Sequence, residues 1–111
     1  MKAKKAFYKE CHVAGRKYHD ADFVFEQLNV GTKLHLVRDT DNRYDPDAIA
    51  LLYHTNDGEF IIGYIPSNEN EEMARFLDMG WTDLFDCRIS RINPLAHYEQ
   101  QIHITIRINQ K

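Results

Sequence analysis

The chain has 111 residues, of which 43% are hydrophobic and 28% are charged. This length and balance predict one globular domain with its own hydrophobic core, and they exclude a disordered tail. The formal net charge of −3 excludes a protein that holds nucleic acid by overall positive charge alone, although it is compatible with a local basic patch.

The N-terminal third predicts a strand, a short helix and a second strand. Residues 7–13 alternate loosely between apolar and polar side chains, which is typical of a half-buried strand. Residues 20–29 follow, with Val24 and Leu28 four positions apart and therefore on one face of a helix. Residues 32–38 alternate again and predict the second strand.

The remainder of the chain predicts a hairpin, a second helix and two further strands. Two dense apolar runs, 48–53 and 60–65, are separated by turn-forming residues and indicate a β-hairpin. A helix is expected over 68–79, because acidic residues crowd its first turn, where the helix dipole favours them. Residues 85–92 and 102–108 alternate as strands.

The same periodicity predicts which side chains form the core. In the last strand four isoleucines are expected to point inward: Ile102, Ile104, Ile106 and Ile108. In the second helix the expected buried stripe is Met73, Phe76 and Leu77, and the expected N-cap is Ser67 or Asn68. The predicted order β-α-β-β-β-α-β-β has few, short helices and favours a mainly β fold, a small curled barrel, over a doubly wound sheet.

Motifs that carry catalysis or bind metals are missing from the sequence. It contains no phosphate-binding glycine loop, no HExxH motif and no GxSxG motif. The six histidines lack paired ligand spacing. The acidic run 39–47 departs from an EF-hand loop, which would have glycine in place of Tyr44 and glutamate in place of Ala50. We therefore expect no metal, no cofactor and no enzymatic activity.

The cysteines and the absence of long apolar segments bear on the cellular compartment. Cys11 and Cys87 are far apart, and two free, buried thiols are expected rather than a disulfide. No apolar run approaches the ~18 residues that a membrane helix needs. The basic N-terminus is not followed by the apolar core of a signal peptide. These features predict a cytoplasmic protein that does not enter a membrane.

Two clusters combine cations, rings and polar groups. The first cluster follows Gly15 and consists of Arg16, Lys17, Tyr18 and His19. The second consists of Arg38, Asp39, Asn42, Arg43, Tyr44 and Asp45. Cations suit phosphates, aromatic rings stack on bases, and carboxylates accept hydrogen bonds from hydroxyls. Because Asp, Asn and Pro are also ordinary turn formers, the residues alone leave both a binding site and solvated turns open.

Three segments around these clusters resemble the HIRAN domain family. They are 13–20 (VAGRKYHD), 36–50 (LVRDTDNRYDPDAIA) and 62–66 (IGYIP). The family pattern has an early G-x-x-Y, a central R-D-x-x-N-x-Y-D-x-N-A-I/V and a G-Y/H-I/L-P turn before a helix. The resemblance covers most of the chain, and the central motif is long and specific. It indicates a single HIRAN-like domain over residues 1–111, with its core at about 7–109.

The resemblance implies an OB-like or SH3-like barrel that binds DNA, in characterised eukaryotic members the 3′-hydroxyl end of a single strand. Lys17 and Tyr18 match a pair that holds phosphate and stacks on the terminal base. Asn42, Tyr44 and Asp45 match a loop that closes over the terminal nucleotide, where the aspartate accepts a hydrogen bond from the 3′-hydroxyl. The complete predicted site is Arg16, Lys17, Tyr18, His19, Arg38, Asp39, Asn42, Arg43, Tyr44, Asp45 and Tyr64.

Some positions depart from the family pattern. His19 replaces a second aromatic ring of some eukaryotic members, Arg43 stands where proline is common, and Asp47 stands where asparagine is common. The ATPase and RING segments of eukaryotic members have no match in this chain, so ATP hydrolysis and ubiquitin transfer are not implied.

We therefore expect a nucleic-acid-binding module that recognises single-stranded DNA 3′-hydroxyl ends in DNA repair or replication, together with a protein partner such as a helicase or nuclease. The alternative is a protein-interaction or regulatory module that binds no nucleic acid. A third interpretation is an enzyme that cuts phosphodiesters with aspartate-bound metals. Cations that converge on the pocket would favour DNA, whereas interspersed acids would favour a protein partner.

Overall fold

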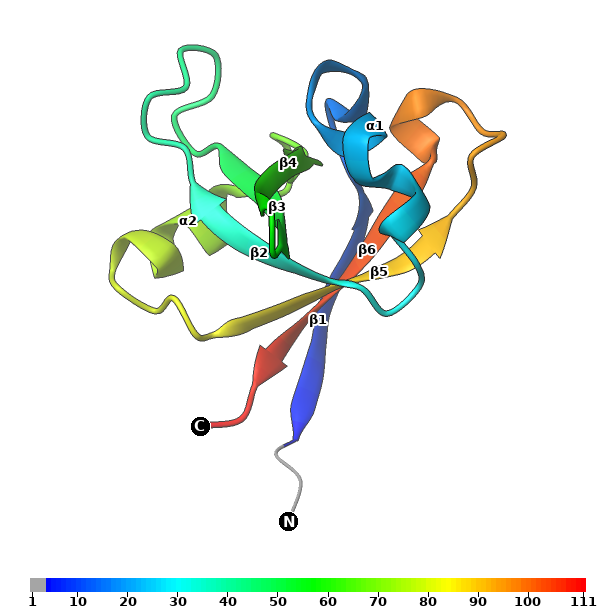
Figure 1. Ribbon diagram of the computed structural model, residues 1–111. Coiled ribbons are helices and arrows are strands. Elements are labelled where there is room, and N and C mark those ends of the chain that lie inside the picture. Colours follow the sequence, from blue (N-terminus) through cyan, green and yellow to red (C-terminus); the bar gives the residue numbers. More distant parts are fainter. Residues whose placement is uncertain (1–3) are drawn as a thin grey trace.

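Six antiparallel strands form one curled sheet in the order β1-β6-β5-β2-β3-β4 (Figure 1). The structure is a computed structural model that describes residues 4–111. Its strands are β1 (Lys5–His12), β2 (Lys33–Arg38), β3 (Ile49–Thr55), β4 (Gly58–Tyr64), β5 (Phe85–Ile92) and β6 (Ile102–Asn109). Its helices are α1 (Ala21–Val24) and α2 (Glu71–Asp78). The predicted element order and the mainly β fold are confirmed.

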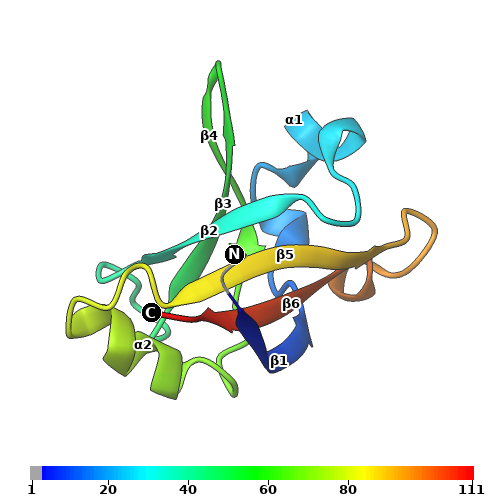
Figure 2. The ribbon, with the colours of Figure 1, turned by 90° about the horizontal axis from the view of Figure 1, so that it is seen from below.

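The sheet curls as predicted but does not close into a continuous barrel. Strands β2 and β5 pair through only two residue pairs, and the β3–β4 hairpin projects away from the other four strands (Figure 2). The two outer strands meet at a single bridge beyond the end of β1. There Ala14 and Tyr64 exchange two backbone hydrogen bonds, each 2.9 Å between nitrogen and oxygen.

The interior of the curl holds the core, and β6 supplies all four isoleucines expected there. Ile102, Ile104 and Ile106 are completely buried. Ile108 also packs against the core, as predicted, but it is only partly buried. It lies near the end of β6 opposite Ala6, whose small exposed side chain cannot cover it.

Both helices are shorter than the periodicity indicates. Helix α1 has four residues and continues as a 3-10 turn over Phe25–Gln27. Helix α2 starts at Glu71 rather than at 68, because the backbone N–H of Glu69 donates to Pro66 and forms a turn instead. The N-cap is therefore Asn70 and not the predicted residues before it.

The buried stripe of α2 also differs from the expectation. Met73 and Leu77 are buried, but the third buried position is Ala74 rather than Phe76, whose side chain is exposed. The ring of Phe76 covers the rim of the core instead, with its centroid 6.2 Å from that of Phe85.

Two free thiols lie in the core, as the sequence predicts. Cys11 and Cys87 are buried and form no disulfide. Burial and the nearby charge of Glu69 raise the pKa of the Cys11 thiol to about 12, and burial raises the pKa of Cys87 further. Within residues 4–111, no helix has the length and apolar character needed to cross a membrane.

The contact between the two outer strands depends on the absence of a side chain at Gly63. A β-carbon at this position would lie 2.4 Å from Cγ1 of Val13 and 2.6 Å from the carbonyl oxygen of Ala14. Such distances are shorter than atoms in contact allow, so the backbone would have to move and the Ala14–Tyr64 bridge would open.

We predict that Gly63→Ala lowers the free energy of unfolding by about 1–3 kcal/mol, the usual cost of overpacking a tight core. Urea unfolding followed by circular dichroism measures the loss. Gly31→Ala is the control, since a β-carbon there meets no atom within 4 Å and adds only the backbone strain of a φ of 93°. A Gly63→Ala protein as stable as wild type would contradict the prediction.

Candidate nucleic-acid interface

An open pocket of about 220 Å³ lies where the end of β4, the turn after β1 and the loop 39–48 converge. It is lined by Ala14, Gly15, Asn42, Tyr44, Asp45, Ala48, Tyr64, Ile65 and Ser67. Four residues of the predicted site are therefore among its walls, although they come from segments twenty positions apart in the sequence. The bridge described above holds the two sides of this pocket together.

The loop 39–48 is folded by hydrogen bonds from its own side chains. Oδ1 of Asn42 accepts the backbone N–H groups of Tyr44 and Asp45, both at 2.9 Å. Oδ1 of Asp45 accepts the N–H of Asp47 at 2.9 Å. These short polar side chains replace backbone partners that a regular element would supply. The loop consequently presents its ring and its carboxylate in a defined orientation.

Helix α2 supports the loop from behind. The completely buried amide of Asn70 donates from Nδ2 to Oδ2 of Asp45 at 2.7 Å. On the same side of the loop, Arg75 forms an ion pair with Asp47. No local pattern predicts this role for Asn70, because an amide beside the start of a helix indicates a cap rather than a support for a distant loop.

Arg38 is a brace of the loop rather than a free cation. Its Nη1 and Nη2 donate to the carbonyl oxygens of Ala48 and Pro46 at 2.7 and 2.9 Å. Its Nε pairs with Oδ1 of Asp78 on α2 at 2.8 Å, and this hydrogen bond lowers the pKa of the Asp78 carboxyl. All three donor nitrogens are engaged, so the guanidinium is not directed at the pocket.

The aromatic residues at the pocket differ in how they are held. Tyr44 is 96% exposed and Tyr18 is 77% exposed. Tyr64 is partly buried, and its hydroxyl donates to Oδ2 of Asp39 at 2.7 Å. Burial, this hydrogen bond and the charge of Asp39 raise the pKa of Tyr64 to about 12. His19 packs beside the Tyr64 ring, with 5.0 Å between the ring centroids.

The first cluster separates into a buried and an exposed cation. Arg16 is only 3% exposed, pairs with Asp22 at 2.8 Å and lies between the rings of Phe25 and Tyr98, at 4.7 and 5.1 Å from their centroids. Its Nε and Nη1 have no hydrogen-bond acceptor among residues 4–111, so the two rings supply the remaining attraction. Lys17 is exposed beside Tyr98, 5.7 Å from its centroid.

The structure thus brings together Asn42, Tyr44, Asp45 and Tyr64, with Asp39 and His19 behind Tyr64. Lys17, Tyr18 and Arg43 are exposed but do not line the pocket, although Lys17 and Tyr18 follow its wall residue Gly15 in the chain. Sequence interpretation missed two residues of the loop between β5 and β6. Tyr98 contacts the first cluster, and Glu99 accepts the N–H of Gly15 at 3.1 Å. No periodicity marks them, because they lie outside regular strands.

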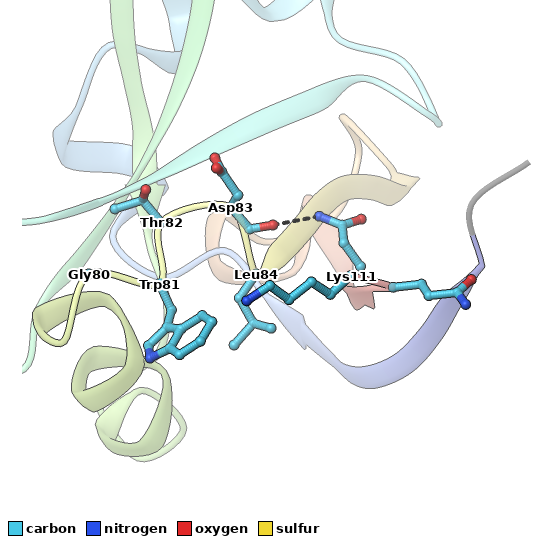
Figure 3. A pocket seen from close by; sticks show the side chains of 8 residues that line it. Gly80, Trp81, Thr82, Asp83, Leu84 and Lys111 are labelled. Atoms are coloured by element: carbon cyan, nitrogen blue, oxygen red, sulfur yellow. Dashed lines mark hydrogen bonds between the residues drawn. The ribbon is translucent and has the colours of Figure 1, made fainter.

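The other hollows of the structure contain fewer groups that could bind a ligand. A larger hollow of about 360 Å³ lies between Trp81 and the C-terminal residues, where Nζ of Lys111 is 5.1 Å from the Trp81 ring centroid (Figure 3). Asn109 donates to the carbonyl oxygen of Asp83 at its wall. Within the part of the chain that the structure describes, no group of three or more His, Cys, Asp or Glu side chains is placed to hold a metal ion.

The family model of the HIRAN domain matches residues 7–109 of this chain. The chain belongs to the HIRAN domain family. HIRAN domains are generally DNA-binding modules linked to nucleases and helicases, and this matches the nucleic-acid-binding class expected from the sequence. The matched segment spans the pocket, the loop 39–48 and all of β6.

Two individual proteins resemble this HIRAN domain. The rice (Oryza sativa subsp. japonica) protein "Fanconi-associated nuclease 1 homolog" is 32% identical over 75 residues, which cover 68% of this chain and 7% of that protein. A crystal structure of a protein from Lactobacillus plantarum superposes with a TM-score of 0.75 and 22% identity, over 99% of this chain and 100% of that chain. The second likeness establishes the fold.

We predict that Asn70→Ala destabilises the protein by about 1–3 kcal/mol, because it removes a donor to a carboxylate and leaves that group partly unsatisfied. A double-mutant cycle with Asp45→Ala, followed by urea unfolding, should give a coupling energy of about 1 kcal/mol or more. Ser67→Ala, at an exposed pocket residue of the same segment, is the control. Strictly additive effects of Asn70→Ala and Asp45→Ala would contradict the prediction.

Proposed function

We propose that this HIRAN domain binds the 3′-hydroxyl end of single-stranded DNA in the pocket of Tyr44, Asp45 and Tyr64. The observation that carries the proposal is the carboxylate of Asp45, fixed by Asp47 and Asn70 at the wall of an open pocket. A fixed carboxylate repels phosphates but accepts a hydrogen bond from a hydroxyl. The group that suits it is a strand end without a phosphate.

The rings around the carboxylate suit a base. Tyr44 is almost completely exposed, although burying an aromatic ring is favourable. A loop that its own hydrogen bonds hold in place and that displays such a ring is suited to stacking, which tolerates any base sequence. Tyr18 offers a second exposed ring, and Lys17 beside it supplies a charge for the adjoining phosphate.

The cations of the site divide between binding and support. Lys17 and Arg43 are exposed and suit phosphates, whereas Arg16 and Arg38 hold the walls of the pocket in place. Because acids interspersed with the cations are also what a protein partner would favour, the proposal of DNA depends on membership of the HIRAN family and on the fixed carboxylate of Asp45. Within that proposal, few free cations close to several carboxylates favour the recognition of one strand end over binding along a continuous backbone, which requires many phosphate contacts.

The biological setting follows from the family and from the rice relative. We infer that the domain acts in DNA repair or replication as a binding module without catalysis of its own, beside a nuclease or helicase that performs the reaction. The name of the rice relative, a nuclease homologue, supports this role, because the segment that resembles this domain makes up only 7% of that protein.

The test compares two single-stranded oligonucleotides that differ only in a 3′-hydroxyl or a 3′-phosphate. Wild-type protein should bind the hydroxyl end about tenfold more tightly or better, which corresponds to one hydrogen bond to a charged group. Asp45→Ala should abolish this preference, and Asp45→Asn should reduce it. Tyr44→Ala should weaken both complexes about tenfold to a hundredfold through lost stacking. Fluorescence anisotropy measures all four proteins.

Two matched variants separate the pocket from general effects. Asp41→Ala removes the same charge from an exposed position of the same loop, and Trp81→Ala removes an exposed ring from the separate hollow. Both should bind as wild type does. Equal affinity of wild type for the two ends would refute end recognition, and failure to bind either oligonucleotide would favour the protein-docking alternative.

A further inference from the structure

The sheet face turned away from the core collects outward side chains from four neighbouring strands. Strands β2, β5, β6 and β1 lie side by side there (Figure 2). Because residues directly opposite each other in an antiparallel pair point to the same side, the register groups these side chains into rows. One row joins Lys33, Arg88 and Thr105, and the neighbouring row joins Asp86 to Arg107.

This face is basic in a chain whose net charge is −3. The residues between its rows are core residues such as Cys87 and Ile106, so the charged residues point outward. Five cations stand against two carboxylates on the strands themselves, Glu10 and Asp86, and a third carboxylate, Asp83, lines the same hollow as Lys33 at the edge of the face. We call the five cations the basic face: Lys5, Lys33, Arg88, Arg91 and Arg107.

One of the two carboxylates is covered by its own partners. Asp86 is 3% exposed and lies 3.2 Å from Nζ of Lys5 and 3.2 Å from Nε of Arg88. Burial by itself would raise the pKa of this carboxyl, but the hydrogen bond from Lys5 and the charge of Arg88 outweigh it and keep the pKa below its ordinary value. The buried anion therefore positions two cations at the surface rather than repelling a ligand.

The other three cations have no internal partner. Within residues 4–111, Lys33, Arg91 and Arg107 form no ion pair with a carboxylate. Cations on one rigid sheet face, left without partners in a chain that has an excess of acids, create a local positive potential. Such a potential is the electrostatic footprint of a polyanion site.

We propose that the basic face binds the phosphate backbone of double-stranded DNA that adjoins the single-stranded end, a proposal that rests on the function assigned to the pocket. The chain connects the two sites directly. Strand β1 ends at His12 beside the basic face, and Ala14 and Gly15, which follow it in the chain, line the pocket. The domain measures 39 × 37 × 27 Å. About ten base pairs, at about 3.4 Å each, span that length.

The layout of the face favours a duplex over the other polyanions. The cations spread across four strands, over about 14 Å at 4.8 Å between strands, whereas a single strand would need one linear track. Sites for single strands also depend on stacking rings. In the basic rows the outward rings are Phe7 at one end and the small imidazoles of His12 and His103 at the other, so no row of large rings crosses the face. A protein interface would have an apolar centre, but here the centre is formed by Thr105 and Arg88.

The test measures binding of a short duplex with a 3′-hydroxyl overhang and of the same overhang alone, over a series of salt concentrations. Wild type should bind the partial duplex about tenfold more tightly or better at low salt, with a steeper salt dependence. The triple variant Lys33→Gln/Arg91→Gln/Arg107→Gln leaves the buried Asp86 and its two partners intact. Its salt slope should fall by about one for each cation that contacts a phosphate, and the advantage of the duplex should disappear.

The controls separate this proposal from the function of the pocket. The triple variant should keep the wild-type preference for a 3′-hydroxyl over a 3′-phosphate on the overhang alone. Lys111→Gln removes one cation outside the basic face, and it should change neither this preference nor the tighter binding of the partial duplex. If wild type binds both 3′ ends equally but the triple variant loses the tighter binding of the partial duplex, the basic face is upheld and end recognition by the pocket is refuted. A triple variant that binds the partial duplex as wild type does would overturn the proposal. Competition by poly-glutamate as strong as by duplex DNA would also overturn it, in favour of an acidic protein segment.

Discussion

Two backbone hydrogen bonds between Ala14 and Tyr64 join the outer strands of the curled sheet, and the arrangement of the pocket depends on them. They bring Gly15, from the first part of the chain, against residues of the loop that precedes β3. The close approach is allowed by the missing side chain of Gly63. A single short contact between sheet edges thus replaces the full ladder that would close a barrel, and it leaves the pocket open to solvent on its outer side.

The remaining architecture shields the pocket from its own charges. The loop 39–48 carries several carboxylates, but Arg75 pairs with Asp47 on the side that faces α2, and Asn70 holds the carboxylate of Asp45 in place. Positive charge is instead concentrated on the opposite side of β1 and its neighbours. A small acidic protein can in this way present an acceptor for a hydroxyl and a surface for phosphates, because the two kinds of charge are carried by different elements.

The strands and their succession along the chain could be predicted, because the alternation of apolar and polar residues can be recognised within each strand alone. Their order in the sheet was not predicted, because it depends on contacts between distant segments. The start of α2 and the exposure of Phe76 could not be predicted. The first depends on the turn at Pro66, and the second depends on which side of the helix packs against the sheet. Arg16 shows the same limit at the site. Its burial requires the ring of Tyr98, which lies 82 positions later in the chain, and no local pattern announces that contact.

The basic face illustrates a second reason why a surface of this kind cannot be predicted from the sequence alone. Arg88 and Arg107 each occupy an ordinary outward position of an alternating strand, which alone suggests nothing beyond solvation. Their common significance arises only when the register sets β2, β5 and β6 side by side. The central loop motif, by contrast, is continuous in the chain, and its residues Asn42, Tyr44 and Asp45 could be recognised directly.

The two buried thiols have a practical consequence for chemical work on the protein. Thiolates are the reactive species in alkylation and oxidation, and the raised pKa values of Cys11 and Cys87 keep both side chains protonated at neutral pH. Both residues are also buried in the core. A single cysteine introduced at an exposed loop position would therefore be the preferred target of a maleimide dye, and the folded domain would accept a label without removal of its native cysteines.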